Sequence, residues 1–165
     1  MRKIITASLA VAALVAAGSA SAANANTTFS VTATVLKTCS TTASTLGFGS
    51  YLPGGGDLTI NTTVNVKCTK GTTFTVALDK GTTATGTVAQ RLMTNGTDTL
   101  QYNLYTTAAF GTIFGDTLGL TQAGTGTGLA NNVGFTVYGK LPDNASNQGV
   151  TPGSYSDTIG VTVSY

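Results

Sequence analysis

DLTINTTVNVKC, residues 57–68, alternates between polar and apolar side chains. Its even positions carry one apolar face, which consists of Leu58, Ile60, Val64, Val66 and Cys68. An alternation with a period of two indicates a strand with one buried face. We therefore expect a strand here, with the cysteine pointing into the core.

The same period returns in short runs along the chain. They read TFTVAL at 73–78, LQYNLY at 100–105, NVGFTVYGKL at 132–141 and YSDTIGVTVSY at 155–165. Turn signals separate these runs, among them PGGG at 53–56 and AGTGTG at 123–128. We interpret residues 124–128 as a flexible hairpin loop. Short strands at regular spacing predict an all-β antiparallel sandwich or barrel. Each strand has one solvent-exposed face and one buried face, which favours two packed sheets.

The first 22 residues have the pattern of a secretory signal peptide. Arg2 and Lys3 precede an apolar run, and Ala20-Ser21-Ala22 fits a cleavage site, with Ala23-Asn24-Ala25 as an alternative. We expect residues 1–22 to be removed on export to the periplasm. The remaining residues have the usual size of one domain.

Export changes the charge of the chain. Two of its eight basic residues leave with the signal peptide, so six basic residues face six acidic ones in the mature protein. A neutral chain with scattered charges has no electrostatic footprint for nucleic acid, and we predict no such partner. Low net charge also favours self-association.

Cys39 and Cys68 are the two cysteines of the sequence. An even number of cysteines in an exported chain favours a disulfide. Two buried free thiols are the alternative reading.

A further alternating stretch, TTFSVTATVLKTC at 27–39, ends at Cys39, the first of the two cysteines. Phe29, Val31, Ala33 and Val35 form its apolar face. No disulfide can tether this strand to a downstream partner, so its own partner is an open question.

The residue inventory argues against an enzyme. The sequence has no His, and its six acidic residues are all Asp, which excludes Ser-His-Asp or Cys-His pairs and the usual zinc sites. Each Asp lies in or beside a predicted turn, where Asp ordinarily forms the turn itself. We predict no catalytic residue, no metal site and no cofactor.

Several motifs together resemble the spore coat protein U family. They are TFSVTATVLKTCS at 28–40, LGFGSY at 46–51, VNVKCTKGTTFTVALDKG at 64–81, LQYNLYT at 100–106, FTVYGKLP at 135–142 and VTPGSYSDTIGVTVSY at 150–165. Members of this family are secreted subunits of the archaic chaperone–usher type, similar to the major pilin of the Csu pilus. Many relatives have Asp where this chain has Thr107.

The resemblance implies an incomplete immunoglobulin-like sandwich that a donated strand completes. It implies residues 23–37 as the donor strand, residues 38–165 as the pilin domain, and Ile159, Val161, Val163 and Tyr165 as a groove edge and chaperone contact. The implied partners are a periplasmic chaperone, an outer-membrane usher and other copies of the chain, in a cell-surface fibre or spore coat with a role in adhesion or biofilm. The alternative is a self-contained secreted adhesin or lectin, whose strand 29–35 completes its own sheet.

Overall fold

The computed structural model describes residues 22–165. Nearly all of the predicted signal peptide, residues 1–21, lies outside the described residues, so that prediction stays untested. The chain divides into two units, Met1–Thr34 and Val35–Tyr165, which are described separately. In the described part, no helix has the length and apolar character needed to cross a membrane.

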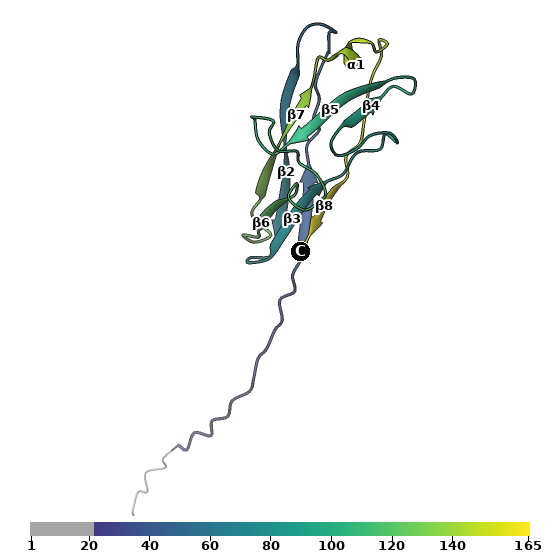
Figure 1. Ribbon diagram of the computed structural model, residues 1–165. Coiled ribbons are helices and arrows are strands. Elements are labelled where there is room, and N and C mark those ends of the chain that lie inside the picture. Colours follow the sequence, from purple (N-terminus) through teal and green to yellow (C-terminus); the bar gives the residue numbers. More distant parts are fainter. Residues whose placement is uncertain (1–21) are drawn as a thin grey trace, which may run out of the picture. The chain divides into compact units, whose positions relative to one another are not determined.

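The larger unit contains a five-stranded antiparallel sheet with the order β1-β2-β7-β5-β4 (Figure 1). Its strands are β1 Cys39–Ala43, β2 Leu58–Cys68, β4 Arg91–Thr94, β5 Thr99–Tyr105 and β7 Val133–Leu141. β2 and β7 form the longest ladder, from the pair Leu58 and Leu141 to the pair Val66 and Val133.

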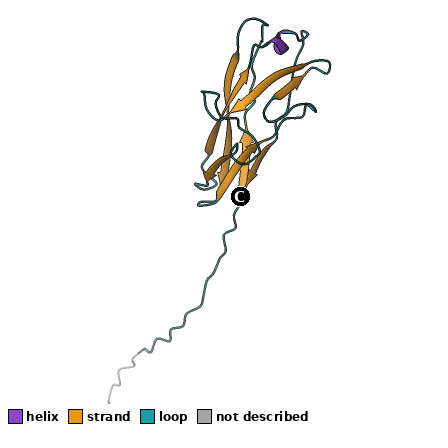
Figure 2. Cartoon of the chain, viewed as in Figure 1, coloured by secondary structure: helices purple, strands orange, loops and turns teal. Residues whose placement is uncertain are grey.

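A second antiparallel sheet has three strands in the order β6-β3-β8. They are β3 Thr73–Leu78, β6 Gln122–Thr125 and β8 Val161–Ser164. One short helix, α1 Ala145–Gln148, interrupts the strands and loops of the described part (Figure 2). Two antiparallel sheets with a shared core confirm the predicted all-β sandwich.

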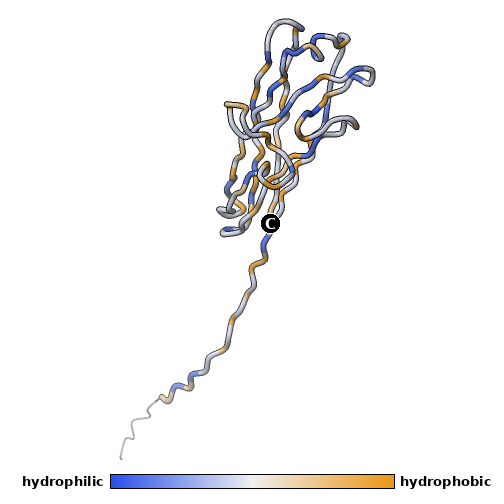
Figure 3. Tube along the Cα trace, viewed as in Figure 1, coloured by the Kyte–Doolittle hydropathy of each residue, from blue (hydrophilic) through white to orange (hydrophobic). Residues whose placement is uncertain are grey.

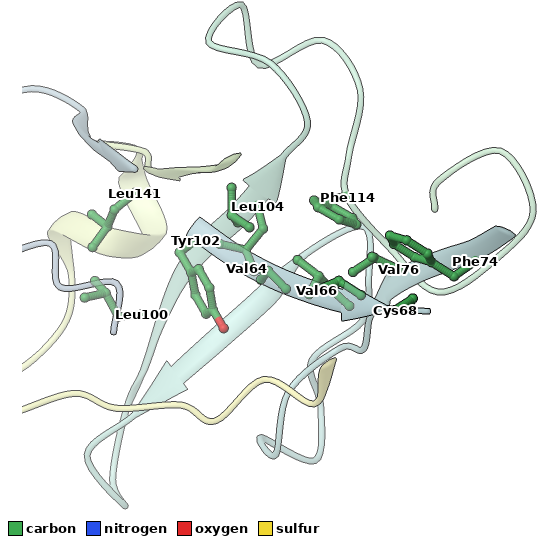
Figure 4. Packing of buried hydrophobic residues seen from close by; sticks show 12 residues of the cluster. Val64, Val66, Cys68, Phe74, Val76, Leu100, Tyr102, Leu104, Phe114 and Leu141 are labelled. Atoms are coloured by element: carbon green, nitrogen blue, oxygen red, sulfur yellow. The ribbon is translucent and has the colours of Figure 1, made fainter. Parts of the chain in front are cut away.

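The core lies between the sheets and follows the predicted alternation. Val64, Val66 and Cys68 of β2 face Phe74, Val76 and Leu78 of β3, and all six are at most 3% exposed. The core runs from Phe74 and Cys68 at one end to Leu100 and Leu141 at the other (Figure 4). Along the strands the hydropathy of the chain changes from residue to residue (Figure 3), as expected when one face of each strand is buried.

The predicted disulfide is confirmed. Cys39 and Cys68 are bonded across the β1–β2 ladder, where they lie opposite each other. Ile60 differs from its prediction, because it is 42% exposed instead of buried. It lies opposite Gly139, which has no side chain to cover it, and β1 pairs with β2 only as far as Val64.

Three strands, β1, β4 and β6, were not predicted from the sequence. β6 lies partly in the glycine-rich stretch that predicted a flexible loop, and that prediction is wrong for Gly124 and Thr125. Gly124 pairs with Phe74 of β3, and an added Cβ at this position would come within 2.6 Å of the Phe74 ring. Close approach to a large aromatic ring therefore requires a glycine here.

The described residues before β1 form no helix or strand. In the smaller unit, residues 22–34 run as an extended trace (Figure 1). Phe29 is 86% exposed and Val31 is 82% exposed. In the larger unit, Val35 is 85% exposed.

Candidate functional site

A groove of about 1110 Å³ opens in the larger unit. Two stretches of chain form its walls, which we call the first wall (residues 43–51) and the second wall (residues 150–161). The first wall continues from β1, and the second wall leads into β8. The groove therefore lies between one edge of each sheet.

The floor of the groove is apolar. Its buried side chains come from four strands of both sheets and are Val64, Leu78, Leu100, Tyr102, Leu104, Val137 and Leu141. These residues also belong to the central hydrophobic cluster. The groove is thus an opening onto the core itself, and an apolar ligand in it would extend the core.

Both strands beside the groove have an unpaired edge. Among the described residues, β1 pairs only with β2, and β8 pairs only with β3. β1 and β8 also approach each other. An unpaired edge presents a row of backbone donors and acceptors that can pair with a further strand. The groove therefore offers apolar contacts along its floor, and the two unpaired strand edges reach it at Ala43 of β1 and Val161 of β8.

Hydrogen bonds attach the beginning of the second wall to the β4–β5 hairpin. The amide N–H and the hydroxyl of Thr151 both donate to Oδ2 of Asp98, over 2.9 and 2.6 Å. Hydrogen bonds from Thr151 hold the pKa of Asp98 below its usual range. Thr94 and Ser156 exchange two backbone hydrogen bonds of 3.0 and 3.1 Å.

Asp157 attaches the middle of the second wall to the core. Its Oδ2 accepts a hydrogen bond of 2.7 Å from the Tyr102 hydroxyl, and its Oδ1 accepts bonds from the amide and hydroxyl of Thr82. Burial raises the pKa of Asp157, but these hydrogen bonds outweigh it and the net pKa is lowered. Burial and then the bond to Asp157 raise the pKa of the Tyr102 hydroxyl, so the pair is a neutral donor and an ionised acceptor.

Asp79 attaches the end of the second wall to β3. Its Oδ1 accepts from the amides of Gly81 and Gly160, both over 2.9 Å. An added Cβ at Gly160 would overlap with the Asp79 carboxylate, so the close approach requires glycine. Three carboxylates therefore fix the second wall, at residues 151, 157 and 160.

The first wall is held at its two ends, by the pairing of Ala43 with β2 and by a hydrogen bond of Tyr51. The Tyr51 hydroxyl donates a hydrogen bond of 2.5 Å to Oδ1 of Asp143, which also accepts from the amide of Gly54. Desolvation and then this hydrogen bond raise the pKa of Tyr51 to about 12. The same bond is the largest cause that lowers the pKa of Asp143 to about 2. Next to it, Lys140 and Asp57 form an ion pair of 2.7 Å.

The four residues predicted as a groove edge have different surroundings. Ile159 and Val161 line the groove, whereas Val163 packs against the core without lining it. Tyr165 is 58% exposed and lies beside a shallow depression near Phe74. β8 is also shorter than the alternating run 155–165 suggested, since it spans Val161–Ser164.

Sequence reasoning missed most of the groove. It did not identify the first wall or the Asp157–Tyr102 hydrogen bond, and it assigned Asp residues only to turns. A local signal was present in the alternating pair Leu46 and Phe48, which glycines flank. Among the described residues, no cluster of His, Cys or acidic side chains could hold a metal ion.

Comparison with known proteins identifies the family. The Spore Coat Protein U domain matches residues 25–162, and the chain belongs to this family. The resemblance seen in the sequence motifs is thus confirmed. No curated protein matches the chain.

A solved structure with a similar fold is the CsuC-CsuE chaperone-tip adhesion subunit pre-assembly complex from archaic chaperone-usher Csu pili of Acinetobacter baumannii. The TM-score is 0.54 at 20% sequence identity, over 80% of this chain and 40% of the matched chain. The chain therefore spans less than half the length of that relative, and the likeness concerns the fold.

Proposed function

We propose that this protein is a structural subunit of a cell-surface fibre or coat, assembled by strand donation between copies of the chain. The groove between the first and second walls, which lead out of β1 and into β8 and have core residues as their floor, is the observation that carries this proposal. A strand added there would gain backbone hydrogen bonds at the edges, and its alternate side chains would fill the groove.

Residues 23–37 supply a suitable donor. Phe29, Val31 and Val35 are each more than 80% exposed, so nearly all of their apolar surface is available for burial. Ala33 continues the same face at the same spacing. Full burial of a large apolar side chain contributes about 1.5–3 kcal/mol, so three such residues support a stable junction.

Donor and acceptor are different parts of the chain. The donor precedes the first cysteine, and the acceptor groove lies after it. A contact between two different surfaces is head-to-tail, and it grows into an open fibre unless a rotation closes it into a ring. The proposed assembly is therefore a fibre with one donated strand per junction.

The exposed groove requires protection before assembly. Open apolar grooves and unpaired strand edges lead to aggregation. We propose that a periplasmic chaperone covers the groove after export and that an outer-membrane usher replaces it with the next subunit. Support comes from the family membership and from the similar fold in a chaperone–subunit complex. Ile159, Val161, Val163 and Tyr165 are the proposed chaperone contact. The absence of His and Glu supports a role that is not enzymatic.

A self-contained adhesin or lectin would place strand 29–35 in its own sheet. Membership of the Spore Coat Protein U family favours donation instead. Deleting residues 23–37 separates the two functions, because a self-contained fold would lose an integral strand, whereas a fibre subunit would still fold and bind its chaperone.

A synthetic peptide of residues 27–37 tests the proposed function. We expect the peptide to bind the purified protein and to stop fibre growth, and the same peptide with Val31→Asp to do neither. A wild-type peptide that neither binds nor affects fibre length would overturn strand donation by this segment.

A further inference from the structure

The first wall places two of its own apolar side chains in the groove. Leu46 and Phe48 are half-buried and pack against the core, whereas their neighbours Thr45, Gly47 and Gly49 are exposed. Both half-buried residues line the groove. We call this pair the stopper.

The seat of the stopper is built into the sheet. Gly139 of β7 lies under it, and an added Cβ there would come within 2.9 Å of Leu46 and 3.1 Å of Phe48. The Phe48 ring meets the Tyr102 ring edge-on, with 6.1 Å between the centroids. Both side chains therefore contact the floor that the proposed donor strand would cover.

The spacing of the stopper matches that of the donor. Leu46 and Phe48 are two residues apart, as are Phe29 and Val31. Side chains two residues apart point to the same side of an extended chain. The first wall thus presents apolar groups to the groove in the same way as a donated strand.

The backbone of the stopper is weakly held. The β1–β2 ladder ends at Ala43, and Ser44 makes the last hydrogen bonds to β2. Among the described residues, no hydrogen bond involves positions 45–50. Gly47 and Gly49 flank Phe48, and Gly49 has a φ of +76°, a conformation that glycine adopts readily. The second wall, in contrast, is fixed by three carboxylates.

We propose that the stopper occupies the groove of the unassembled subunit and is displaced when a donor strand enters. This inference rests on the proposed function, since it needs a strand that binds the groove. The groove then has one fixed wall and one movable wall. The stopper shields the core from water before assembly, and it reduces the apparent affinity for a donor to the intrinsic affinity multiplied by the fraction of time that the groove is open.

The test compares donor binding in the full exported protein and in the double variant Leu46→Ala, Phe48→Ala. The probe is a fluorescent peptide of residues 27–37. If the groove is open about one-tenth of the time, the double variant binds the peptide about tenfold more tightly. Leu52→Ala is the matched control, because Leu52 is close in sequence, 73% exposed and outside the groove lining.

Each outcome of the binding comparison either supports or overturns the proposal. Tighter binding by the double variant, with Leu52→Ala unchanged, supports the stopper. Equal or weaker binding by the double variant overturns it, because Leu46 and Phe48 then act as permanent wall. A peptide that binds neither protein overturns the proposed function, and the inference about the stopper is then overturned as well.

A single-residue probe covers the case in which the double variant does not fold. The chain has no Trp, so Phe48→Trp introduces a unique fluorophore at the stopper. We expect its emission to shift to longer wavelength when the peptide is added, because the displaced side chain enters water. An unchanged emission or a shift to shorter wavelength would show that the stopper stays in place and would overturn the inference.

Discussion

Replacing Val31 by Asp is expected to abolish fibre assembly without destabilising the subunit. Val31 is 82% exposed in the free chain, so the change removes no packing from the folded domain. Substitutions at exposed positions usually alter stability by no more than about 0.5 kcal/mol. In the proposed junction, by contrast, the side chain is buried against an apolar floor.

The expected loss follows from two contributions. Burying the exposed 82% of Val31 stabilises the junction by about 1.2–2.5 kcal/mol, and Asp does not replace it. Asp enters an apolar groove most readily in its neutral form, and protonating a side chain with a pKa near 3.9 at pH 7 costs about 4 kcal/mol. The sum is at least about 5 kcal/mol, which weakens the junction more than about a thousandfold.

Fibre length and the sedimentation of purified subunits measure the effect. Thr32→Asp is the matched control, since it places the same charge one residue away on the opposite face and should weaken assembly less than about tenfold. At pH 4 the Val31→Asp defect should shrink, because the carboxyl is then about half protonated. Equal defects in the two variants, or a defect that is independent of pH, would refute burial of this face.

Three further predictions concern the subunit itself. Cys39→Ala with Cys68→Ala removes the disulfide, which joins residues 29 positions apart. The free energy of unfolding in urea should fall by about 3–4 kcal/mol, because the unfolded chain is no longer restrained by the closed loop. A loss under about 1 kcal/mol would contradict this entropic argument. Arg91 is fully buried and donates hydrogen bonds to three backbone carbonyls and one side-chain amide oxygen. Arg91→Lys should therefore lower the free energy of unfolding by about 3 kcal/mol. An unchanged melting temperature would show that these hydrogen bonds are dispensable. The pKa of Asp143 is lowered to about 2 in the folded state, so its contribution to stability is present above pH 4 and lost between about pH 4 and 2. Asp143→Asn should therefore flatten the dependence of the free energy of unfolding on pH in this range. An identical acid transition in both proteins would exclude the Tyr51 hydrogen bond as its cause.

Much of the fold was predictable because strand alternation is a local property. Val64 and Val66 of β2, and Phe74 and Val76 of β3, are buried as their spacing predicts. The disulfide was equally predictable, because two cysteines in an exported chain favour a bond between them. In such segments the side-chain pattern alone distinguishes the buried face of the strand from its solvent-exposed face.

Elements without this pattern were missed because their conformation depends on distant neighbours. β6 has the sequence QAGT and is a strand because it pairs with β3, nearly 50 residues earlier in the chain. Ile60 has the right period for the core, but the end of β1 and the glycine opposite leave it exposed. Strand propensity is a weak guide where cross-strand contacts decide.

The sequence by itself determined the class of this protein: an all-β chain with one disulfide, family motifs, a neutral charge balance and an alternating segment before the first cysteine. Only the tertiary structure revealed the groove in which we propose that this segment binds. The groove joins residues from 43 to 161, and carboxylates fix one wall while two apolar side chains occupy the other. Such a site is built from segments that are distant in the sequence, so no local run of residues encodes it.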